Sequence, residues 1–358
     1  MGEFDEYKRL GEPEKKEKSE NWSVAVGLQQ TDGLTPSKYL IETAKENIDG
    51  KITIYEVKER LNEYYRTNPL KKDDDRTEEA DKVAARIAEI LSERTFKFSP
   101  AEYITIHKRL FAGIYGHAGR IRDYNISKAE WVLNGGTVFY ASADSIRATL
   151  DYDFSKEKEH SYKGFGGEEV AKHMARFVSG IWQIHAFGEG NTRTTAVFAI
   201  KYLRTLGFCM TGDMFNENSW YFRNALVRAN YNDHKKGIFA TTEYLDRFFG
   251  NLLLGEKNVL KNREMLVSAE GAHVAGDRLN YIVKSKNDTV NDTVKPKNDT
   301  VFSLIKGTPN ITAATIAEMT GRGIATVKRE IKRLKEQGTI ERIGSDKTGY
   351  WKVLKDVD

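Results

Sequence analysis

The run HAFGEGNTR, from His185 to Arg193, constrains this chain more than any other segment. It places an imidazole, a carboxylate and a guanidinium around a Gly-Asn-Thr turn. Apolar residues recur at helical spacing on both sides of the run, upstream as Val170, Met174, Phe177, Val178, Ile181 and Trp182 and downstream as Ala196, Val197, Ala199, Ile200 and Leu203. The turn is therefore predicted to join two amphipathic helices. Free backbone N–H groups and the positive end of the helix dipole favour anion binding where the second helix begins.

The polar residues of this run have the types that nucleotide chemistry requires. His185 ends the first helix, where a general base for a hydroxyl nucleophile would stand; the alternative is a structural histidine. Glu189 is a candidate magnesium ligand, because this ion takes few protein carboxylates; the alternative is an acid that stabilises the helix N-terminus. Gly190 allows close approach of a phosphate, Asn191 can order the turn, and Arg193 suits contact with phosphates.

Length and composition limit the classes of protein to which the chain can belong. The 358 residues are expected to form about two to three units, and 39% hydrophobic content allows a sizeable core. The single cysteine, Cys209, excludes a disulfide framework and fits a reducing cytosol. The N-terminus has no apolar signal core, and no apolar run approaches the ~20 residues of a membrane span. A cytoplasmic protein without membrane contact is expected.

Composition shifts divide the chain into seven predicted parts, of which the C-terminal unit is described below. Residues 1–21 are charged and are expected to be a disordered tail. Residues 22–69 contain two helices, one starting at Ser37 and ending at Asp49-Gly50, the next starting near Ile54 and ending near Asn68-Pro69. Residues 70–80 form a solvated connector. The helical core spans 83–255, a helical extension 256–283, and a linker with three Asn-Asp-Thr-Val repeats spans 284–300.

One hairpin-like segment interrupts the helical core. Residues 131–133 and 138–140 are apolar and flank Asn134-Gly135-Gly136, a signal for a tight turn. The fold class expected for the whole chain is therefore mainly α, with a β-hairpin in the core and a small C-terminal unit.

The C-terminal unit, residues 301–358, is predicted to be a winged helix-turn-helix. Helices are expected at 301–306, 313–319 and 325–337, and two strands at 339–342 and 350–353. The third helix is basic, with candidate DNA contacts at Lys328, Arg329, Lys332 and Arg333. The alternative is a protein-docking module with a solvated charged face.

At the central motif the sequence resembles the Fic (filamentation induced by cAMP) family. The family signature, His-x-Phe-x-Asp/Glu-Gly-Asn-Gly-Arg-x-x-Arg, is matched by His185, Phe187, Glu189, Gly190, Asn191 and Arg193. Upstream, residues 96–128 are similar to the leading helix of the family and to the Ala-Gly-x-x-Arg approach to its flap. The resemblance to the family extends over about residues 83–255. Within it, the hairpin at 131–140 corresponds to the flap that aligns a target segment.

The resemblance implies a protein adenylyltransferase that uses ATP and Mg²⁺. His185 would deprotonate a Ser, Thr or Tyr hydroxyl of a target protein, which could be the enzyme itself, and AMP would be transferred to it. Glu189 would hold Mg²⁺. The nucleotide would contact Phe187, Gly188, Glu189, Gly190, Asn191, Thr192 and Arg193, with Tyr221 and Asn224 as candidates for the nucleoside. The flap residues that dock the target would be Val132, Leu133, Val138 and Phe139.

Two departures from the signature affect the end that holds the γ-phosphate. Thr192 stands where the family has glycine, which puts a hydroxyl beside the phosphates, and Ala196 replaces the second arginine. Losing one bidentate contact would cost about 1.5–3 kcal/mol of nucleotide positioning. Two alternatives therefore stay open: a nucleotide-sensing DNA-binding regulator with a non-catalytic core, and a phosphotransferase.

Residues 24–65 resemble the small antitoxin that blocks some Fic toxins, here fused to the same chain. Its inhibitory glutamate corresponds to Asp32, followed by Gly33, and the arginine that pairs with this glutamate corresponds to Ala196. Because both halves of the pair are altered, weak inhibition is expected. The alternative is an accessory helical hairpin. The expected partners are a target protein and DNA, and the sequence leaves a homodimer open.

Overall fold

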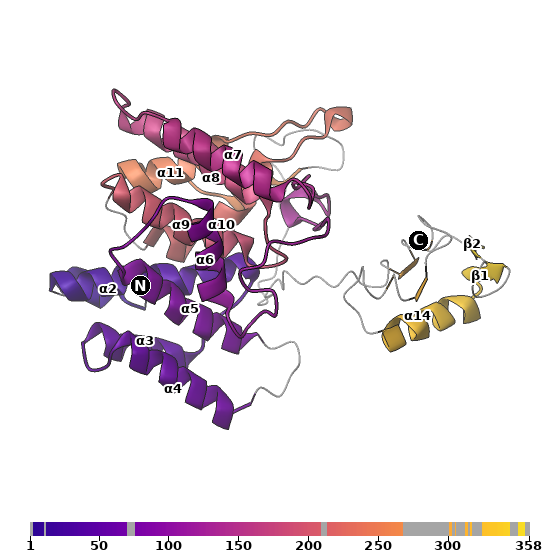
Figure 1. Ribbon diagram of the computed structural model, residues 1–358, viewed down its shortest axis with the longest axis horizontal. Helices are drawn as coiled ribbons and strands as arrows, with labels where there is room; N and C mark the ends of the chain where they lie inside the picture. The colour runs from indigo at the N-terminus through magenta and orange to yellow at the C-terminus, as the bar shows by residue number, and fades with distance from the viewer. Residues whose placement is uncertain are drawn as a thin grey trace, which may run out of the picture. The chain divides into compact units, whose positions relative to one another are not determined.

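The computed structural model describes residues 3–10, 12–69, 76–208, 213–267, 301–302, 305, 312–313, 316, 324–343 and 350–354 (Figure 1). The chain divides into two compact units, Met1–Thr289 and Val290–Asp358. Cys209, the predicted linker at 284–300 and the greater part of the first two C-terminal helices lie outside the described residues.

The first unit is built from helices. Its N-terminal half contains α1 (Asp5–Leu10), α2 (Pro13–Gly27), the 3₁₀ helix η1 (Leu28–Asp32), α3 (Lys38–Ile48), α4 (Ile54–Thr67), α5 (Thr77–Ser92) and α6 (Pro100–Phe111). Its second half contains η2 (Trp131–Leu133), α7 (Ile146–Glu159), α8 (Gly167–Ile184), α9 (Asn191–Thr205), α10 (Asp213–Ala229), η3 (His234–Lys236), α11 (Glu243–Leu254) and η4 (Asn262–Met265). The mainly α fold class is confirmed.

The predicted disordered tail is wrong for most of residues 1–21, which form α1 and the first half of α2. Phe4 is 3% exposed and joins the main core, and Ser19 is fully buried. Helix α2 packs on α5 and α10, so its charged N-terminal turns lead directly into a buried segment that includes Trp22. The segment is highly charged, so its few buried apolar residues were not apparent from composition. These residues are sufficient to order a helix once a partner surface exists.

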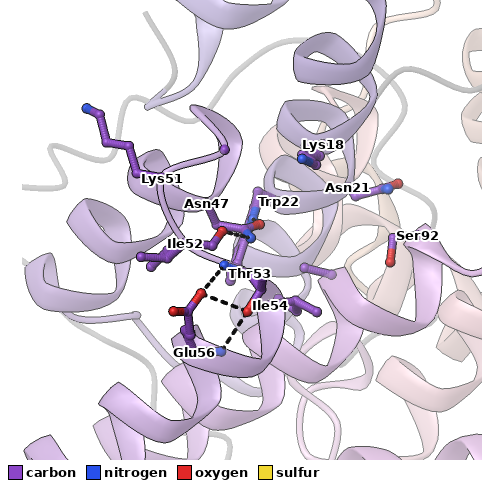
Figure 2. Close-up of a pocket in the computed structure, with 12 residues that line it drawn as sticks. Lys18, Asn21, Trp22, Asn47, Lys51, Ile52, Thr53, Ile54, Glu56 and Ser92 are labelled. Atoms are coloured by element: carbon purple, nitrogen blue, oxygen red, sulfur yellow. Dashed lines mark hydrogen bonds between the residues drawn. The ribbon is translucent and has the colours of Figure 1, made fainter.

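The two helices expected within 22–69 are confirmed, and both have side-chain caps at their N-termini. The Ser37 side chain accepts a hydrogen bond from the backbone N–H of Leu40, and Thr53 and Glu56 form a capping box at the start of α4 (Figure 2). Trp22 of α2 donates through Nε1 to Asn47 Oδ1 of α3 at 3.0 Å. The N-terminal helices are therefore joined by packing and by buried hydrogen bonds.

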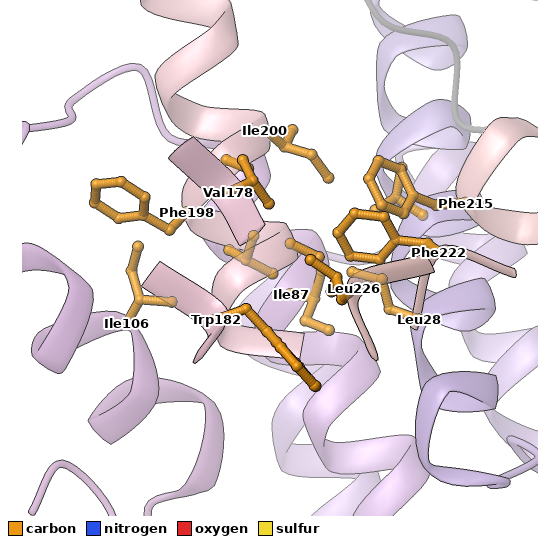
Figure 3. Packing of buried hydrophobic residues seen from close by; sticks show 14 of the residues in the cluster. Leu28, Ile87, Ile106, Val178, Trp182, Phe198, Ile200, Phe215, Phe222 and Leu226 are labelled. Atoms are coloured by element: carbon orange, nitrogen blue, oxygen red, sulfur yellow. The ribbon is translucent and has the colours of Figure 1, made fainter. Parts of the chain in front are cut away.

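Helix α9 is the central helix of the first unit, buried without interruption from Asn191 to Leu203. It contacts η1, α5, α6 and α8, and α8 in turn packs on α7 and α11. Figure 3 shows Leu28 of η1 packed with Phe222 and Leu226 of α10, so the N-terminal segment contributes to the same core as the central helices. Helix α10 is kinked at Asn218, where the backbone leaves helical values.

The expected hairpin at 131–140 is correct at its turn and wrong in its strands. Asn134 and Gly135 both have positive φ, and Gly136 N donates to Leu133 O at 3.0 Å, which closes a two-residue turn of the predicted kind. Residues 131–133, however, form the 3₁₀ helix η2, and 138–140 have no strand partner among the described residues. Val132, Leu133 and Val138 of the segment are buried against the helical core, which takes the place of cross-strand pairing.

The region after α11 departs from the predicted helical extension at 256–283. Residues 256–267 contain only the short η4 and otherwise irregular backbone, and 268–283 lie outside the described residues. Met265 is 1% exposed, and Val267 N donates to Val132 O, so the end of the segment 256–267 packs on η2. In the described parts of the chain, no helix has the length and apolar character needed to cross a membrane.

The described parts of the second unit are α14 (Ile324–Glu336), β1 (Ile340–Ile343) and β2 (Tyr350–Val353). The strands pair antiparallel, with Ile340 opposite Val353. Val327, Ile331 and Leu334 lie on the buried face of α14, in a core shared with Ile340. The third helix and both strands of the predicted winged helix are thus confirmed as elements, while the winged helix as a whole stays a prediction.

Candidate functional site

The run from His185 to Arg193 forms the turn between α8 and α9, as its spacing predicts. His185 is the C-cap of α8 and has φ 49°, a left-handed backbone conformation that is rare for residues other than glycine. Gly190, with φ 77°, is the N-cap of α9. A Cβ at Gly190 would lie 2.4 Å from the Phe111 ring, so both its backbone angle and its surroundings require glycine.

The turn is held by side chains of its own sequence. Asn191 Oδ1 accepts from Phe187 N at 3.0 Å, and Asn191 Nδ2 donates to Phe187 O at 2.7 Å. Phe187, which the resemblance assigns to the nucleotide contacts, is fully buried and belongs to the main core. The Thr192 hydroxyl accepts a hydrogen bond from Trp182 Nε1 at 3.0 Å and is 5% exposed. The expectation that this hydroxyl faces the phosphates is therefore wrong: it is directed into the contact between α8 and α9.

Arg122 holds the C-terminal end of α8 through hydrogen bonds to its backbone carbonyls. Its Nε donates to His185 O at 2.7 Å, and its Nη1 and Nη2 donate to Tyr124 O and Ala141 O. Its backbone N–H donates to Ala186 O at 2.9 Å. Arg122 stands within the Ala-Gly-x-x-Arg segment noted in the sequence, but its contacts to backbone carbonyls had no sequence signal.

The imidazole of His185 is buried and uncharged. It is 4% exposed, lies against the Tyr140 ring at 4.1 Å between centroids, and neither ring nitrogen has a hydrogen-bond partner among the described residues. Burial, together with the nearby charges of Lys128, Arg122 and Arg223, holds the pKa of His185 well below 6.5. A neutral imidazole with unused nitrogens is able to accept a proton at neutral pH.

His107, on α6, links the leading helix to the turn and was missed in the sequence. Its Nδ1 accepts from Gly119 N at 2.8 Å, so Nε2 carries the proton and donates to Glu189 O at 2.9 Å. Its ring stacks on Phe187 with 3.7 Å between centroids. Burial lowers the pKa of His107 to about 4, which keeps this bridge intact at neutral pH.

The Glu189 side chain faces solvent beside Lys128. Its Oε2 lies 3.0 Å from Lys128 Nζ, and its side chain is 51% exposed. Over the described residues, no group of three or more His, Cys, Asp or Glu side chains is arranged to hold a metal ion. A single accessible carboxylate nevertheless fits Mg²⁺, because this ion keeps several waters and takes its other ligands from substrate phosphates.

Arg193 is fully buried and turned toward the N-terminal segment. Its Nη1 donates to Gln29 Oε1 at 3.1 Å, and its Nη2 donates to Glu79 Oε1 at 2.8 Å. Tyr115 OH is a second acceptor for Nη2, at 3.1 Å. The Arg193 Nε lies 2.5 Å from Asp32 Oδ2, as an ion pair without the alignment of a hydrogen bond. We call Gln29, Asp32, Glu79 and Tyr115 the arginine clamp.

Two arginines and two carboxylates balance the charge of the clamp. Arg76 pairs with Glu79 through Nη2 at 2.8 Å, so Arg76 and Arg193 face Asp32 and Glu79. Burial alone would raise the pKa of Glu79, but the hydrogen bond from Arg76 and the charge of Arg193 lower it to about 2. Glu79 is 7% exposed and lies in the first turn of α5, so the predicted solvated connector at residues 70–80 is wrong at this position.

Asp32 reaches the motif, but through a different arginine from the one that the resemblance indicates. Its partner is Arg193 on the first turn of α9, whereas position 196, the expected partner, is a buried alanine. Asp32 ends η1, and Gly33 follows with φ 68°, a left-handed C-cap that turns the chain toward α3. The expected pair of segments is therefore brought together, with Arg193 in place of the missing second arginine.

The predicted target-docking residues divide into buried and exposed. Val132, Leu133 and Val138 are 0%, 4% and 2% exposed and belong to the core, so a contact with a target would have to use their backbone, and their docking role stays a prediction. Phe139 is 79% exposed, and its carbonyl accepts from Gln183 Nε2 on α8. Trp131, 44% exposed, is a second aromatic side chain on the outer side of this segment that the sequence analysis did not assign.

The remaining predicted contacts lie on α10 and α14. Tyr221 is 2% exposed, and its hydroxyl has no partner among the described residues. Asn224 is fully buried and donates through Nδ2 to Asn262 Oδ1 at 2.9 Å. Lys328, Arg329, Lys332 and Arg333 are all exposed on α14, and Arg333 pairs with Glu330 at 2.6 Å.

One comparison with known proteins, a match to a family model, agrees with the resemblance. Residues 97–203 match the family model for the Fic/DOC family. No curated protein matches the chain. The N-terminal FIC domain of Bep8, a VirB-translocated effector protein from Bartonella sp. 1-1C, is 19% identical with a TM-score of 0.38, covering 48% of this chain and 81% of that one. The N-terminal Fic domain of a Bep effector from Bartonella sp. AR 15-3 is 19% identical with a TM-score of 0.36, covering 54% and 82%.

Proposed function

We propose that this protein is a protein adenylyltransferase that moves AMP from ATP to a hydroxyl side chain of a target protein. The observation that carries the proposal is a buried, neutral His185 at the end of α8, next to the glycine-capped N-terminus of α9. A base beside a helix N-terminus is suited to a hydroxyl nucleophile and a phosphate. The Fic/DOC family match, which includes the whole of this turn, supports the same chemistry.

In the proposed reaction the acceptor hydroxyl of Ser, Thr or Tyr gives its proton to His185. The oxygen then forms a bond to the α-phosphorus of ATP, and the bond from that phosphorus to the bridging oxygen breaks. AMP stays on the target, and pyrophosphate leaves with the bonding electron pair. The exposed Phe139 and Trp131 border the approach of the target in this proposal, because they are the accessible apolar side chains of the flap segment.

The nucleotide contacts in the proposal come from the turn itself. The backbone N–H groups of residues 188–192 would receive phosphate oxygens, with Phe187 and Asn191 holding the turn in shape. Glu189 would hold a magnesium ion that arrives with the nucleotide and neutralises phosphate charge. Tyr221 and Asn224 remain our candidates for the nucleoside, since each keeps one buried polar atom without a partner among the described residues.

We further propose that the arginine clamp is an inhibited state. A guanidinium has five N–H donors, and the clamp surrounds those of Arg193 with two carboxylates, an amide and a phenol. Arg193 cannot contact the β- and γ-phosphates without leaving these partners. This arrangement favours stronger inhibition than the altered sequence pair suggested, because Glu79 adds a second carboxylate.

The experiment that tests the proposed function compares ATP labelled at the α- or the γ-phosphate. We expect protein to retain α-label only, and His185→Ala to retain neither label while keeping its circular dichroism spectrum. Label from γ alone would indicate a phosphotransferase. Label from neither, with nucleotide still bound, would indicate a nucleotide-sensing regulator. Either result would overturn the proposal, as would undiminished labelling of the His185→Ala variant.

A further inference from the structure

We propose that Lys128 is a phosphate-binding residue of the nucleotide site, held by Glu189 until a nucleotide arrives. The inference rests on the proposed function and names a residue that the motif does not include. Lys128 lies between α6 and η2, and its backbone N–H donates to Thr137 Oγ1 at 3.2 Å, which anchors it to the segment that covers the site. Its Nζ lies 3.0 Å from Glu189 Oε2.

Elimination of the other cations near His185 leads to Lys128. Among the cations whose charge lowers the pKa of the imidazole are Lys128, Arg122 and Arg223. The N–H groups of Arg122 donate to the backbone carbonyls of His185, Tyr124, Ala141 and Ile184. Arg223 pairs with Glu130 at 2.8 Å. Lys128 alone of the three is paired with the carboxylate that the proposed function assigns to magnesium.

The motif arginines do not supply the missing contact. Arg193 is enclosed in the clamp, and position 196 is alanine. A polyphosphate placed at the start of α9 therefore meets the accessible ammonium of Lys128, whose side chain is 28% exposed, whereas Arg193 is fully buried. An ammonium has three N–H donors, and Glu189 uses one, which leaves two for phosphate oxygens.

The pair gives both charges a partner before a nucleotide binds. The Glu189 carboxylate and the Lys128 ammonium neutralise each other at the exposed edge of the turn. When a nucleotide brings magnesium to Glu189, the carboxylate changes partner and the ammonium turns to the phosphates. Lys128 is thus a ligand for the nucleotide. Before the nucleotide binds, it is the ion-pair partner of Glu189, the carboxylate that would hold magnesium.

The test measures equilibrium binding of a fluorescent α,β-methylene analogue of ATP to the full-length protein, with Mg²⁺ and with EDTA. Lys128→Met keeps the length of the side chain and removes its charge. A charge-assisted hydrogen bond is worth about 1.5–3 kcal/mol, so the dissociation constant should rise about tenfold or more. Competition by adenosine, which has no phosphate, should be unchanged, and Lys128→Arg should restore most of the affinity.

Lys172→Met is the matched control, because Lys172 on α8 also pairs with a carboxylate, Glu168, at 2.6 Å, and lies more than three helical turns before His185. It should bind as wild type does. In EDTA, Glu189→Gln should bind the analogue more tightly than wild type, and Lys128→Met in that background should remove the gain. A gain that persists in the double variant would mean that Glu189 acts by repulsion alone and would overturn the proposed exchange of partners.

The outcomes separate this inference from the proposed function. Wild-type affinity in Lys128→Met, together with α-label transfer by the wild type, overturns the role of Lys128 only. Weakened binding in Lys128→Met without any transfer of label by the wild type supports Lys128 and overturns the transferase. A wild-type protein that binds no nucleotide overturns both.

Discussion

At the scale of single residues, the chemistry of the site depends on which histidine is free. His107 and His185 are both buried near the turn, but His107 uses both nitrogens on backbone groups, while His185 uses neither among the described residues. The sequence motif singles out His185, and its role as the base stays a prediction. It gives no sign of the role of His107, because that role depends on Gly119 and Glu189, which approach only when α6 packs on α9.

The pH dependence of transfer follows from the uncharged state of His185. Because burial holds its pKa well below 6.5, the base stays unprotonated through the neutral range. We expect the rate of AMP transfer to be nearly constant from about pH 8 down to 6.5 and to fall only in more acidic solution. Initial rates with α-labelled ATP across this range provide the measurement. A half-loss of rate at or above pH 6.5 would contradict the assignment.

His107 predicts a pH dependence of stability. Its pKa is about 4 in the folded protein against 6.5 for an unperturbed histidine, so the unfolded chain binds more protons between these values. The stability due to neutral His107 is therefore complete above pH 6.5 and is lost as pH falls toward 4. Between pH 7 and 4.5 this loss is roughly 2 kcal/mol.

Urea unfolding of wild type and His107→Gln at both pH values isolates this contribution. The variant should be less stable at pH 7 and should lose about 2 kcal/mol less than wild type on acidification. Equal losses in the two proteins would show that His107 does not titrate with the lowered pKa.

At the scale of elements, helices with strong apolar periodicity were predictable and their long-range contacts were not. The caps at Ser37 and Thr53 and the turn between α8 and α9 follow from local sequence. Glu79 and Arg193 are 114 residues apart, and the short charged segment that contains Glu79 looks solvated by composition. Only the packing of α5 against α9 reveals that it is buried.

The N-terminal helices are predicted to be part of the folded unit. Phe4→Ala removes a side chain that is 3% exposed, and a buried Phe→Ala change costs about 3–5 kcal/mol, less where the site can relax. We expect a clear drop in the thermal midpoint. Tyr55→Ala, at a residue 64% exposed, is the control and should have little effect. An unchanged midpoint for Phe4→Ala would restore the idea of a disordered tail.

At the scale of the whole molecule, the chain divides into two compact units, and the second carries the basic helix α14. We propose that the exposed basic face of α14 binds DNA through phosphates, so binding should weaken steeply with salt. Replacing Lys328 and Lys332 by alanine should reduce the slope of log K against log salt by about 2. Fluorescence anisotropy with a labelled duplex measures this slope, and Lys172→Ala in the first unit is the control. An unchanged slope would favour a protein-docking role for α14.

The central claim, that His185 drives AMP transfer and the arginine clamp restrains it, is tested most directly with Asp32→Asn. This change keeps the shape of the side chain and removes the charge that faces Arg193. The measurement is the initial rate of α-label incorporation in wild type, Asp32→Asn and Asp32→Asn/His185→Ala. Asp49→Asn, which alters another ion-paired aspartate of the N-terminal segment, is the control. We predict a rate about tenfold above wild type for Asp32→Asn, none for the double variant and no change for the control. A rate in Asp32→Asn equal to that of wild type would contradict the clamp, and label in the double variant would contradict the catalytic role of His185.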